Sequence, residues 1–191
     1  MKLRFATPVD SQALLDIYSQ YINTSITFEY SLPTLEEFAR RISSTLELYP
    51  YLVLEDHGRP VGYAYAHQLR ERVAYQWSAE LSIYLDSDAA GRGTGRPLYT
   101  ALMDLLRLQG VKTVYGVVTH PNPASEGLHR TLGFVLRGIH RNTGYKNGAW
   151  LDVAWYEKGI APYDSDPRPV LPIRQVPSAA VEAILNVSFP E

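Results

Sequence analysis

The chain has no cysteine, only two methionines and no long apolar run. Without cysteine there are no disulfides, no thiolate metal ligands and no covalent intermediate carried on a cysteine. No stretch approaches the roughly eighteen apolar residues of a membrane span, and the first residues lack the apolar core of a signal peptide. We therefore expect a cytoplasmic protein that makes no membrane contact.

An excess of positive charge is also lacking, because 18 Lys and Arg stand against 20 Asp and Glu, for a net charge of −2. A general nucleic-acid binder should be basic, so the composition argues against one. The five histidines show no spacing that suggests a helical metal pair, and we expect no metal site. Any anionic ligand must then be bound by arginines that gather locally.

The residues that are present, 46% hydrophobic and 20% charged over a length of 191, are typical of a folded globular protein. This length suits one domain, which we place at residues 1–160, followed by an extension at 161–191. Repeated prolines interrupt regular structure in the extension until Ser178 can cap a short helix. The sequence leaves open whether the extension is disordered or packs on its own domain or on a second subunit.

Strand and helix patterns are interspersed along the domain. Alternating and β-branched runs predict strands at residues 2–6, 51–55, 61–67, 79–85, 111–119, 135–142 and 150–157. Helical periodicity and capping signals predict helices after Thr7, after Thr34, at 97–108 and at 122–132. The sequence thus predicts a mixed α/β fold.

The most informative stretch runs from Leu81 to Leu98, where an alternating strand leads into a glycine-spaced loop and then into a helix. The glycines at 91, 93 and 95 allow the backbone to approach a ligand and to turn its N–H groups inward. The helix that opens after Pro97 adds the positive end of its dipole, and Arg92 and Arg96 add charge-assisted hydrogen bonds. This combination suits a diphosphate.

Spacing excludes two common phosphate loops here. The dinucleotide fingerprint Gly-x-Gly-x-x-Gly fails because no third glycine stands in the required place, and the P-loop fails because Gly95 is followed by Arg96 and Pro97. An ordinary glycine-rich turn before a helix remains the alternative for this segment taken alone.

Several motifs in register resemble the GNAT superfamily of N-acetyltransferases, and more closely its phosphinothricin acetyltransferase branch. The resemblance covers roughly residues 2 to 158. The matching runs are Tyr-Pro-Tyr-Leu-Val from Tyr49, Gly-Tyr-Ala-Tyr-Ala from Gly62, Ala-Tyr-Gln-Trp-Ser-Ala-Glu from Ala74, His-Pro-Asn from His120, Leu-His-Arg-Thr-Leu-Gly-Phe from Leu128 and Gly-Tyr-Lys-Asn-Gly-Ala-Trp-Leu-Asp-Val from Gly144. The family's fold is a mixed, mostly antiparallel sheet flanked by helices and splayed at the cofactor-binding strand.

The resemblance implies that acetyl-CoA is the co-substrate and that its diphosphate lies on the glycine loop. The residues that match this site are Gly91, Arg92, Gly93, Thr94, Gly95 and Arg96. The pantetheine would lie beside Ile83, Tyr84 and Leu85, whose backbone groups can pair with its amides as one more strand does. Asn122 and Ser125 match further cofactor contacts, although both also make good helix caps. Ala90 departs from the family motif, which usually has Gln or Arg there, so a side-chain contact to the cofactor is expected to be missing.

The family's candidate general base matches Glu80. An amine must be neutral to be acetylated, so a carboxylate near the substrate ammonium is chemically sensible. The apolar neighbours Ala79 and Leu81 argue against a solvated position for this glutamate. His129 matches the Tyr or His near the cofactor sulfur, which implies a proton donor to the leaving thiolate or a substrate contact. Taken alone, one histidine on a short helix is more often structural.

Substrate residues are implied by the same match. Arg70, Arg72 and Tyr75 match the segment that binds an amino acid carboxylate and its anionic side group, and an arginine pair can grip oxyanions. With Glu71 between the arginines, an exposed charged hairpin is the alternative. Phe28 matches an aromatic wall of the same pocket or is part of the core.

These residues predict an acetyl-CoA-dependent N-acetyltransferase that acetylates the α-amino group of a small amino acid analogue, such as phosphinothricin or methionine sulfoximine or sulfone, by direct transfer in a ternary complex. No acyl-enzyme is expected without a cysteine. The alternatives are a catalytically silent acyl-CoA-binding module and a GNAT enzyme for a different amine, such as a peptide N-terminus. Family members are commonly homodimers, so the resemblance also implies a homodimer.

Overall fold

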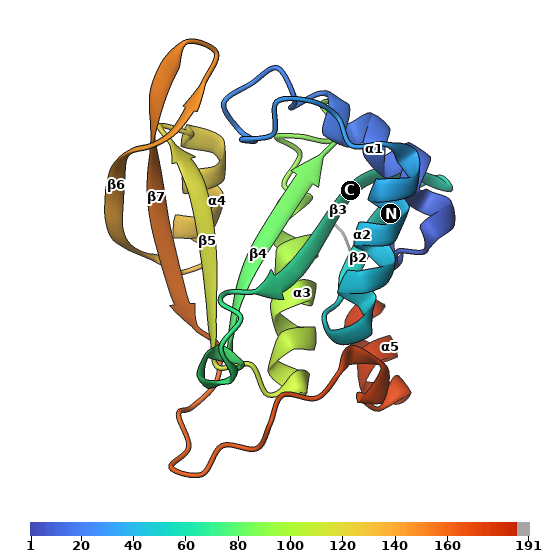
Figure 1. Cartoon of the computed structure of the whole chain (residues 1–191). Helices are drawn as coiled ribbons and strands as arrows, with labels where there is room; N and C mark the ends of the chain where they lie inside the picture. Colours follow the sequence, from blue (N-terminus) through green and yellow to red (C-terminus); the bar gives the residue numbers. More distant parts are fainter. Residues whose placement is uncertain (187–191) are drawn as a thin grey trace.

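The chain folds around a seven-stranded sheet with the strand order β1-β2-β3-β4-β5-β7-β6 (Figure 1). The structure is a computed structural model that describes residues 1–186. Every pair of neighbouring strands is antiparallel except β4 and β5, which are parallel. The predicted mixed, mostly antiparallel sheet is confirmed. The strands are β1 (Lys2–Phe5), β2 (Tyr51–Asp56), β3 (Arg59–Gln68), β4 (Ser78–Leu85), β5 (Thr113–His120), β6 (Val135–Lys146) and β7 (Ala149–Gly159).

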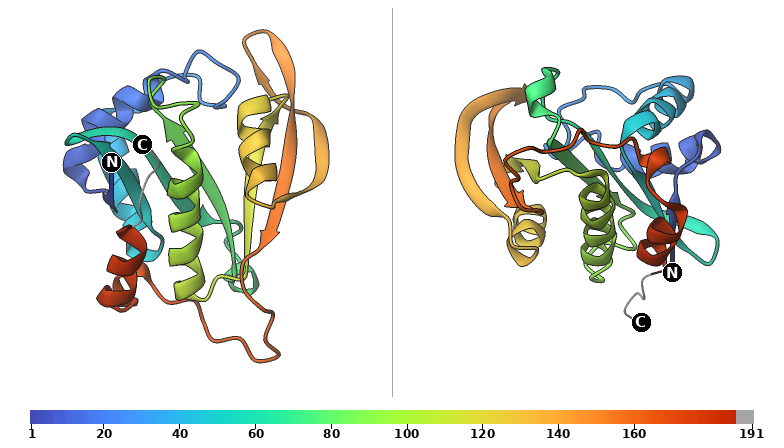
Figure 2. Two further views of the ribbon diagram at one scale, coloured as in Figure 1. Left: turned by 180° about the vertical axis from the view of Figure 1, so that it is seen from behind. Right: turned by 90° about the horizontal axis from the view of Figure 1, so that it is seen from below.

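Helices cover both faces of the sheet. Figure 2 shows α3, α4 and α5 on one face and α1 and α2 on the other. Their bounds are α1 (Ser11–Ser19), α2 (Leu35–Leu48), α3 (Gly95–Gln109), α4 (Pro123–Thr131) and α5 (Ser178–Leu185). Within residues 1–186, no three His, Cys, Asp or Glu side chains gather as a metal site would require, and no helix is long and apolar enough to cross a membrane.

The parallel contact between β4 and β5 is short. Ser78 to Leu81 pair with Thr113 to Gly116, and beyond these residues the two strands separate. On their other sides β4 stays paired with β3 as far as Leu85, and β5 stays paired with β7 as far as His120. The result is an opening in the sheet, which we call the β4–β5 fork, and it confirms the splayed strand that the resemblance implied.

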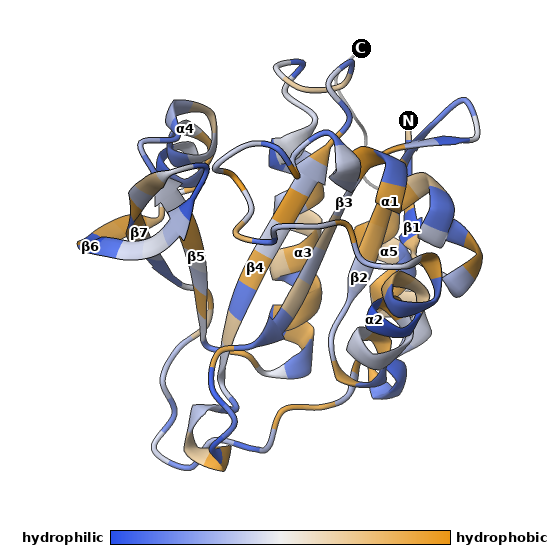
Figure 3. Cartoon of the chain, turned by 45° about the horizontal axis from the view of Figure 1, so that its top comes forward, coloured by the Kyte–Doolittle hydropathy of each residue, from blue (hydrophilic) through white to orange (hydrophobic). Residues whose placement is uncertain are grey.

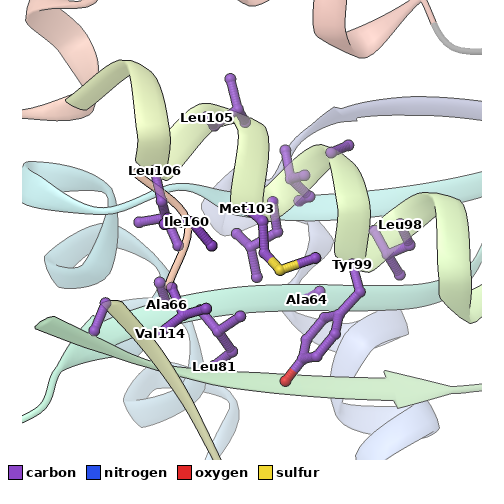
Figure 4. Packing of buried hydrophobic residues seen from close by; sticks show 14 of the residues in the cluster. Ala64, Ala66, Leu81, Leu98, Tyr99, Met103, Leu105, Leu106, Val114 and Ile160 are labelled. Atoms are coloured by element: carbon purple, nitrogen blue, oxygen red, sulfur yellow. The ribbon is translucent and has the colours of Figure 1, made fainter. Parts of the chain in front are cut away.

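The two faces of the sheet have different cores. On one face the buried leucines of α3 pack against β2 to β5, and Figure 4 shows Leu98, Leu105 and Leu106 among them. On the other face α1 and α2 pack on a layer of aromatic rings that includes Tyr51 and Tyr63, whose ring centroids lie 5.7 Å apart. In Figure 3, apolar residues accordingly run along the central strands and along α3. Side chains alternate between these faces along each strand.

Local signals placed most element ends within one or two residues, but β6 continues to Lys146, four residues beyond its predicted end, because it stays paired with β7 there. Thr34 caps α2 as predicted, since its hydroxyl accepts from the Glu37 N–H. The helix behind the glycine loop begins at Gly95, two residues before the predicted start at Pro97. The predicted cap at Ser178 is wrong, because Ser178 is already helical and Pro177 stands at the cap, where its carbonyl accepts the N–H groups of the first turn.

The extension after residue 160 packs on its own domain. Ile173, Val176 and Val181 are buried in the same core as α3. The side chain of Gln109, which is 1% exposed, donates to the Leu48 carbonyl at 2.6 Å and to the Leu171 carbonyl at 2.7 Å. Because one buried amide joins α2, α3 and the extension, the extension contributes to the main core.

We expect Ile173→Ala to lower the free energy of unfolding by about 2–4 kcal/mol, because it removes a buried side chain from the shared core. Leu171→Ala is the matched control in the same segment; Leu171 is 43% exposed, and its replacement should cost about 1 kcal/mol or less. Urea unfolding followed by circular dichroism measures both. Equal losses in the two variants, or a separate early transition for the extension, would contradict the shared core.

Candidate active site

The glycine loop joins the end of β4 to the start of α3. Gly91 and Gly93 both have φ of +77°, and a Cβ at either position would meet open space, so the backbone is exposed to a ligand on that side. Such φ values favour glycine. The Thr94 hydroxyl donates to the Ala89 carbonyl at 3.1 Å and closes the loop, while α3 begins at Gly95. The loop therefore presents glycine backbone and a helix N-terminus together, as anion binding requires.

Asp86 anchors the base of this loop. Its carboxylate is buried and accepts from Arg59 Nη2 at 3.0 Å and from the Asp88 N–H at 3.0 Å. Its carbonyl accepts the N–H groups of Ala89 and Ala90, each at 2.9 Å. These contacts fix the direction in which the chain leaves β4.

An open cleft of about 500 Å³ runs from this loop along the β4–β5 fork. It brings together most of the residues predicted for the cofactor, from β4, the loop, α3 and α4. The lining consists of Tyr21, Ile26, Ile83, Leu85, Ala90, Gly91, Gly93, Gly95, Arg96, Asn122, Ala124, Ser125, Leu128 and Thr131.

Three predicted cofactor residues do not line this cleft. Thr94 is buried beneath the loop. Arg92 lines a separate hollow with Arg59 and Asp86. The Tyr84 side chain packs on the opposite face of the sheet, against Tyr18 at a ring distance of 5.0 Å. Thr94 and Tyr84 can therefore serve a ligand in the cleft only through their backbone.

Asn122 and Ser125 combine the two roles left open by the sequence. Asn122 Oδ1 accepts the Ser125 N–H at 3.2 Å and caps α4. Both residues also line the cleft. The cap thus orients the helix end that faces the fork.

At the inner end of the cleft lies a smaller pocket of about 70 Å³, bounded by β4, β5, α3 and α4. Tyr99 and His129 line it side by side, with ring centroids 5.6 Å apart. Tyr99 reaches the sheet from α3, and Figure 4 shows its hydroxyl pointing toward the strands. Burial raises the pKa of Tyr99 well above its usual range, so its hydroxyl stays protonated.

His129 is held tightly in this pocket. It is 2% exposed, and its Nδ1 lies 2.8 Å from the Ser125 carbonyl, so Nδ1 carries the proton that this acceptor needs. Nε2 is buried and has no hydrogen-bond partner within residues 1–186. It faces Gly116 on β5, where a Cβ would come within 2.0 Å. Burial lowers the pKa of His129, which favours the neutral ring.

Glu80 lies on β4 just before the fork opens. Alternation places its side chain on the face covered by α1 and α2, opposite to that of Leu81. The carboxyl side chain is 23% exposed, and burial raises its pKa, against the opposing effects of His67 and Arg70. A half-buried carboxyl with a raised pKa beside a cleft is a candidate acid or base.

The predicted substrate residues divide into two groups. Arg70, Arg72 and Tyr75 line one open hollow of about 600 Å³ in the loop between β3 and β4. The Arg70 guanidinium lies 5.8 Å from the centre of the Trp155 ring on β7, and its charge lowers the pKa of Glu80. Arg70 thus connects this hollow electrostatically to the carboxyl that the resemblance implied as the base.

Phe28 lies apart from that hollow. Its ring packs on Gly144 of β6, where a Cβ would come within 2.3 Å. Buried Lys146 holds the two segments together, since its Nζ donates to the Ile22 carbonyl at 2.8 Å and to the Thr27 carbonyl at 2.6 Å. The bridge closes the top of the fork, and in Figure 1 the loop after α1 meets the hairpin of β6 and β7 there.

Sequence reasoning missed three side chains of this region. Tyr99 lies on the apolar stripe of α3. In the sequence, only its hydroxyl group distinguishes it from the other side chains of that stripe, which form the core. His67 lies on β3 and Trp155 on β7, and neither is near the glycine loop in the chain. Strand pairing places His67 opposite Glu80, and the fold brings Trp155 close to Arg70.

Comparison with known proteins identifies the family. Residues 3–155 match the model of the acetyltransferase (GNAT) domain. The chain is 36% identical to the phosphinothricin N-acetyltransferase of Streptomyces viridochromogenes, over 92% of this chain and 96% of that protein. It is 32% identical to the L-methionine sulfoximine/L-methionine sulfone acetyltransferase of Pseudomonas aeruginosa, over 86% of this chain and 98% of that protein.

A solved structure agrees with these sequence matches. The GNAT superfamily phosphinothricin acetyltransferase from Sinorhizobium meliloti, in complex with AcCoA, superposes with a TM-score of 0.81 at 34% identity, over 91% of this chain and 98% of that one. The fork, the glycine loop and these matches together lead to one conclusion. The chain belongs to the GNAT acetyltransferase family, among the relatives of the phosphinothricin and methionine sulfoximine N-acetyltransferases.

Proposed function

We propose that this protein transfers the acetyl group of acetyl-CoA to the α-amino group of a small amino acid analogue, such as phosphinothricin or methionine sulfoximine or sulfone, in a ternary complex. One observation supports this most strongly. The half-buried Glu80 carboxyl directly precedes Leu81, which lines the inner end of a cleft that suits an acyl-CoA, and the charge of Arg70, which lines the arginine hollow, lowers its pKa.

The cleft fits acetyl-CoA by shape and by chemistry. The glycine loop has room for a diphosphate, since a Cβ at Gly91 or Gly93 would meet nothing, and Arg96 on the first turn of α3 supplies positive charge. Deeper in the fork, Ile83 and Leu85 line an apolar channel whose open strand edges can pair with pantetheine amides. Acetyl-CoA would supply an activated acetyl group on a thioester.

Glu80 would act as the general base. It takes one proton from the substrate ammonium, directly or through water, and leaves a neutral amine. The amine nitrogen bonds to the thioester carbonyl carbon, the C–S bond breaks, and the second amine proton neutralises the departing thiolate. Backbone N–H groups between Leu81 and Ile83, at the point where β4 loses its parallel partner, would polarise the carbonyl.

The geometry bears on the expected role of His129. A proton donor to the thiolate needs a proton on Nε2, whereas the bond to Ser125 holds the proton of the neutral ring on Nδ1. Tyr99, a neutral hydroxyl in the same pocket, is the group that we favour for passing on this proton: it donates its own proton to the thiolate and takes the second amine proton in return, so that it ends neutral. His129 then has a structural role, because its ring forms part of the wall of the inner pocket.

Two other functions compete with this one. A catalytically silent acyl-CoA-binding module would bind acetyl-CoA but release no thiol, and a GNAT enzyme for a peptide N-terminus would release thiol only with peptides. Polyamines fit poorly, because Arg70 and Arg72 would repel them. Thiol release from acetyl-CoA with methionine sulfone, phosphinothricin, an alanyl peptide and a polyamine distinguishes these functions.

Two further expectations stay predictions. They are the homodimer, which the resemblance implied, and the cytoplasmic location, which the sequence implied. Size-exclusion chromatography with light scattering would test the first.

Replacing Glu80 with Gln should lower kcat/KM for the amine by about ten- to a thousandfold, because the ammonium loses its proton acceptor. Only the ionised carboxyl can act as a base, so wild-type activity should rise with pH through the raised pKa of Glu80. This inflection should vanish in the variant. A variant with the wild-type pH profile would refute the assignment of the base.

Arg72→Ala should raise KM for the amino acid analogue at least about tenfold, since it removes one charged contact to the substrate anion. The affinity for acetyl-CoA, measured by calorimetry, should stay unchanged. Arg40→Ala, on the exposed face of α2, is the matched control. If Arg72→Ala leaves KM at the wild-type value, the hollow between β3 and β4 is not the substrate site.

A further inference from the structure

His67 is the cross-strand neighbour of the proposed base. It lies on β3 directly opposite Glu80 on β4, and its Nε2 is 3.6 Å from Glu80 Oε1. The imidazole is 43% exposed and the carboxyl 23% exposed, so the pair extends from the half-buried base to solvent. Cross-strand partners on one face interact directly, and opposite charges there attract.

We propose that His67 is a positioning residue for the reaction: its protonated imidazole pairs with the Glu80 carboxylate and keeps that carboxylate ionised in mildly acidic solution. The inference rests on the proposed function, in which Glu80 must be ionised to accept a proton. It adds to the acetyltransferase site a cross-strand histidine that favours the ionised form of the base.

The orientation of the ring supports this role. Nδ1 of His67 lies 3.2 Å from the Gln68 carbonyl, an acceptor, so Nδ1 carries a proton. Nε2 is the ring nitrogen that faces Glu80. A proton on Nε2 would therefore lie between the imidazole and the carboxyl.

Charged and titratable groups of several elements surround His67. Glu29, Arg41, Tyr51 and Tyr65 line the hollow next to His67, from the loop after α1, from α2, from β2 and from β3. Arg41 is already paired with Glu29 at 2.7 Å and with a second glutamate on α2.

On the side of Glu80, Arg70 approaches from the loop between β3 and β4, and Tyr115 is the neighbour on β5. Arginine stays charged and tyrosine stays neutral throughout the mildly acidic range. Histidine is the side chain whose charge normally changes between about pH 5 and 8. His67 and Arg70 are the cationic side chains that oppose the effect of burial on Glu80.

The expected consequence has a definite sign. Burial raises the pKa of Glu80, and the charges of His67 and then Arg70 oppose that rise. Without His67, the Glu80 carboxyl should hold its proton to higher pH. The acidic limb of the kcat/KM profile should therefore shift to higher pH. Activity at alkaline pH, where Glu80 is ionised in either case, should change little.

The test measures kcat/KM for methionine sulfone from pH 5 to 9 in His67→Gln and His67→Lys. The Gln variant should be roughly three- to tenfold less active than wild type at about pH 6 and close to wild type at about pH 8.5. The Lys variant keeps a positive charge and should retain the wild-type acidic limb. His57→Gln, which changes a fully exposed turn histidine, is the matched control and should match wild type throughout.

A second readout does not depend on turnover. The side-chain carboxyl of Glu80, assigned in ¹³C NMR spectra by comparison with Glu80→Gln, should titrate at higher pH in His67→Gln than in wild type. An unchanged titration, or an acidic limb unmoved in the Gln variant, would overturn the role of His67. If wild type acetylates none of the amines while the titration still shifts, the proposed function fails and the pairing of His67 with Glu80 stands.

Discussion

The short parallel contact between β4 and β5 is the constraint on which the rest of the molecule depends. Four residues of each strand are paired, and beyond Leu81 and Gly116 each strand is held only from its other side. The opening exposes strand edges that would otherwise be satisfied inside a sheet. Everything proposed for the site follows from what lies around this fork: the glycine loop at its outer end, Tyr99 and His129 at its inner end, and Glu80 beside its base.

The sheet separates two chemical environments across the fork. One face is an apolar core built on α3, where burial lowers the pKa of His129 and favours its neutral ring. The other face is a layer of tyrosine rings that ends at His67 and Glu80, where the cover of α1 and α2 gives way to solvent. Burial raises the pKa of the Glu80 carboxyl at that border, which is still exposed enough to exchange a proton. Position on the sheet thus gives Glu80 its chemistry.

Much of this arrangement could be predicted from residues close together in the chain. The glycine loop, the Thr34 cap and the Asn-Gly turn at Asn147 depend on local backbone preferences, and the structure shows each of them. The start of α3 at Gly95 was missed because Pro97 is the more visible signal, although the helix already begins two residues earlier. The Ser178 cap failed for a similar reason, since Pro177 already supplies the carbonyl that the first turn needs.

Contacts between distant segments could not be predicted in the same way. No local pattern places His67 opposite Glu80 or Phe28 against Gly144, because register and loop packing decide both.

The measurement that tests the central claim most directly is a crystal structure with acetyl-CoA and methionine sulfone bound to Glu80→Gln, which should bind both but turn over slowly. We predict that the thioester lies in the β4–β5 fork and that the substrate amine lies within hydrogen-bond reach of residue 80, directly or through one water. A thioester outside the fork, or an amine remote from residue 80, would contradict the account.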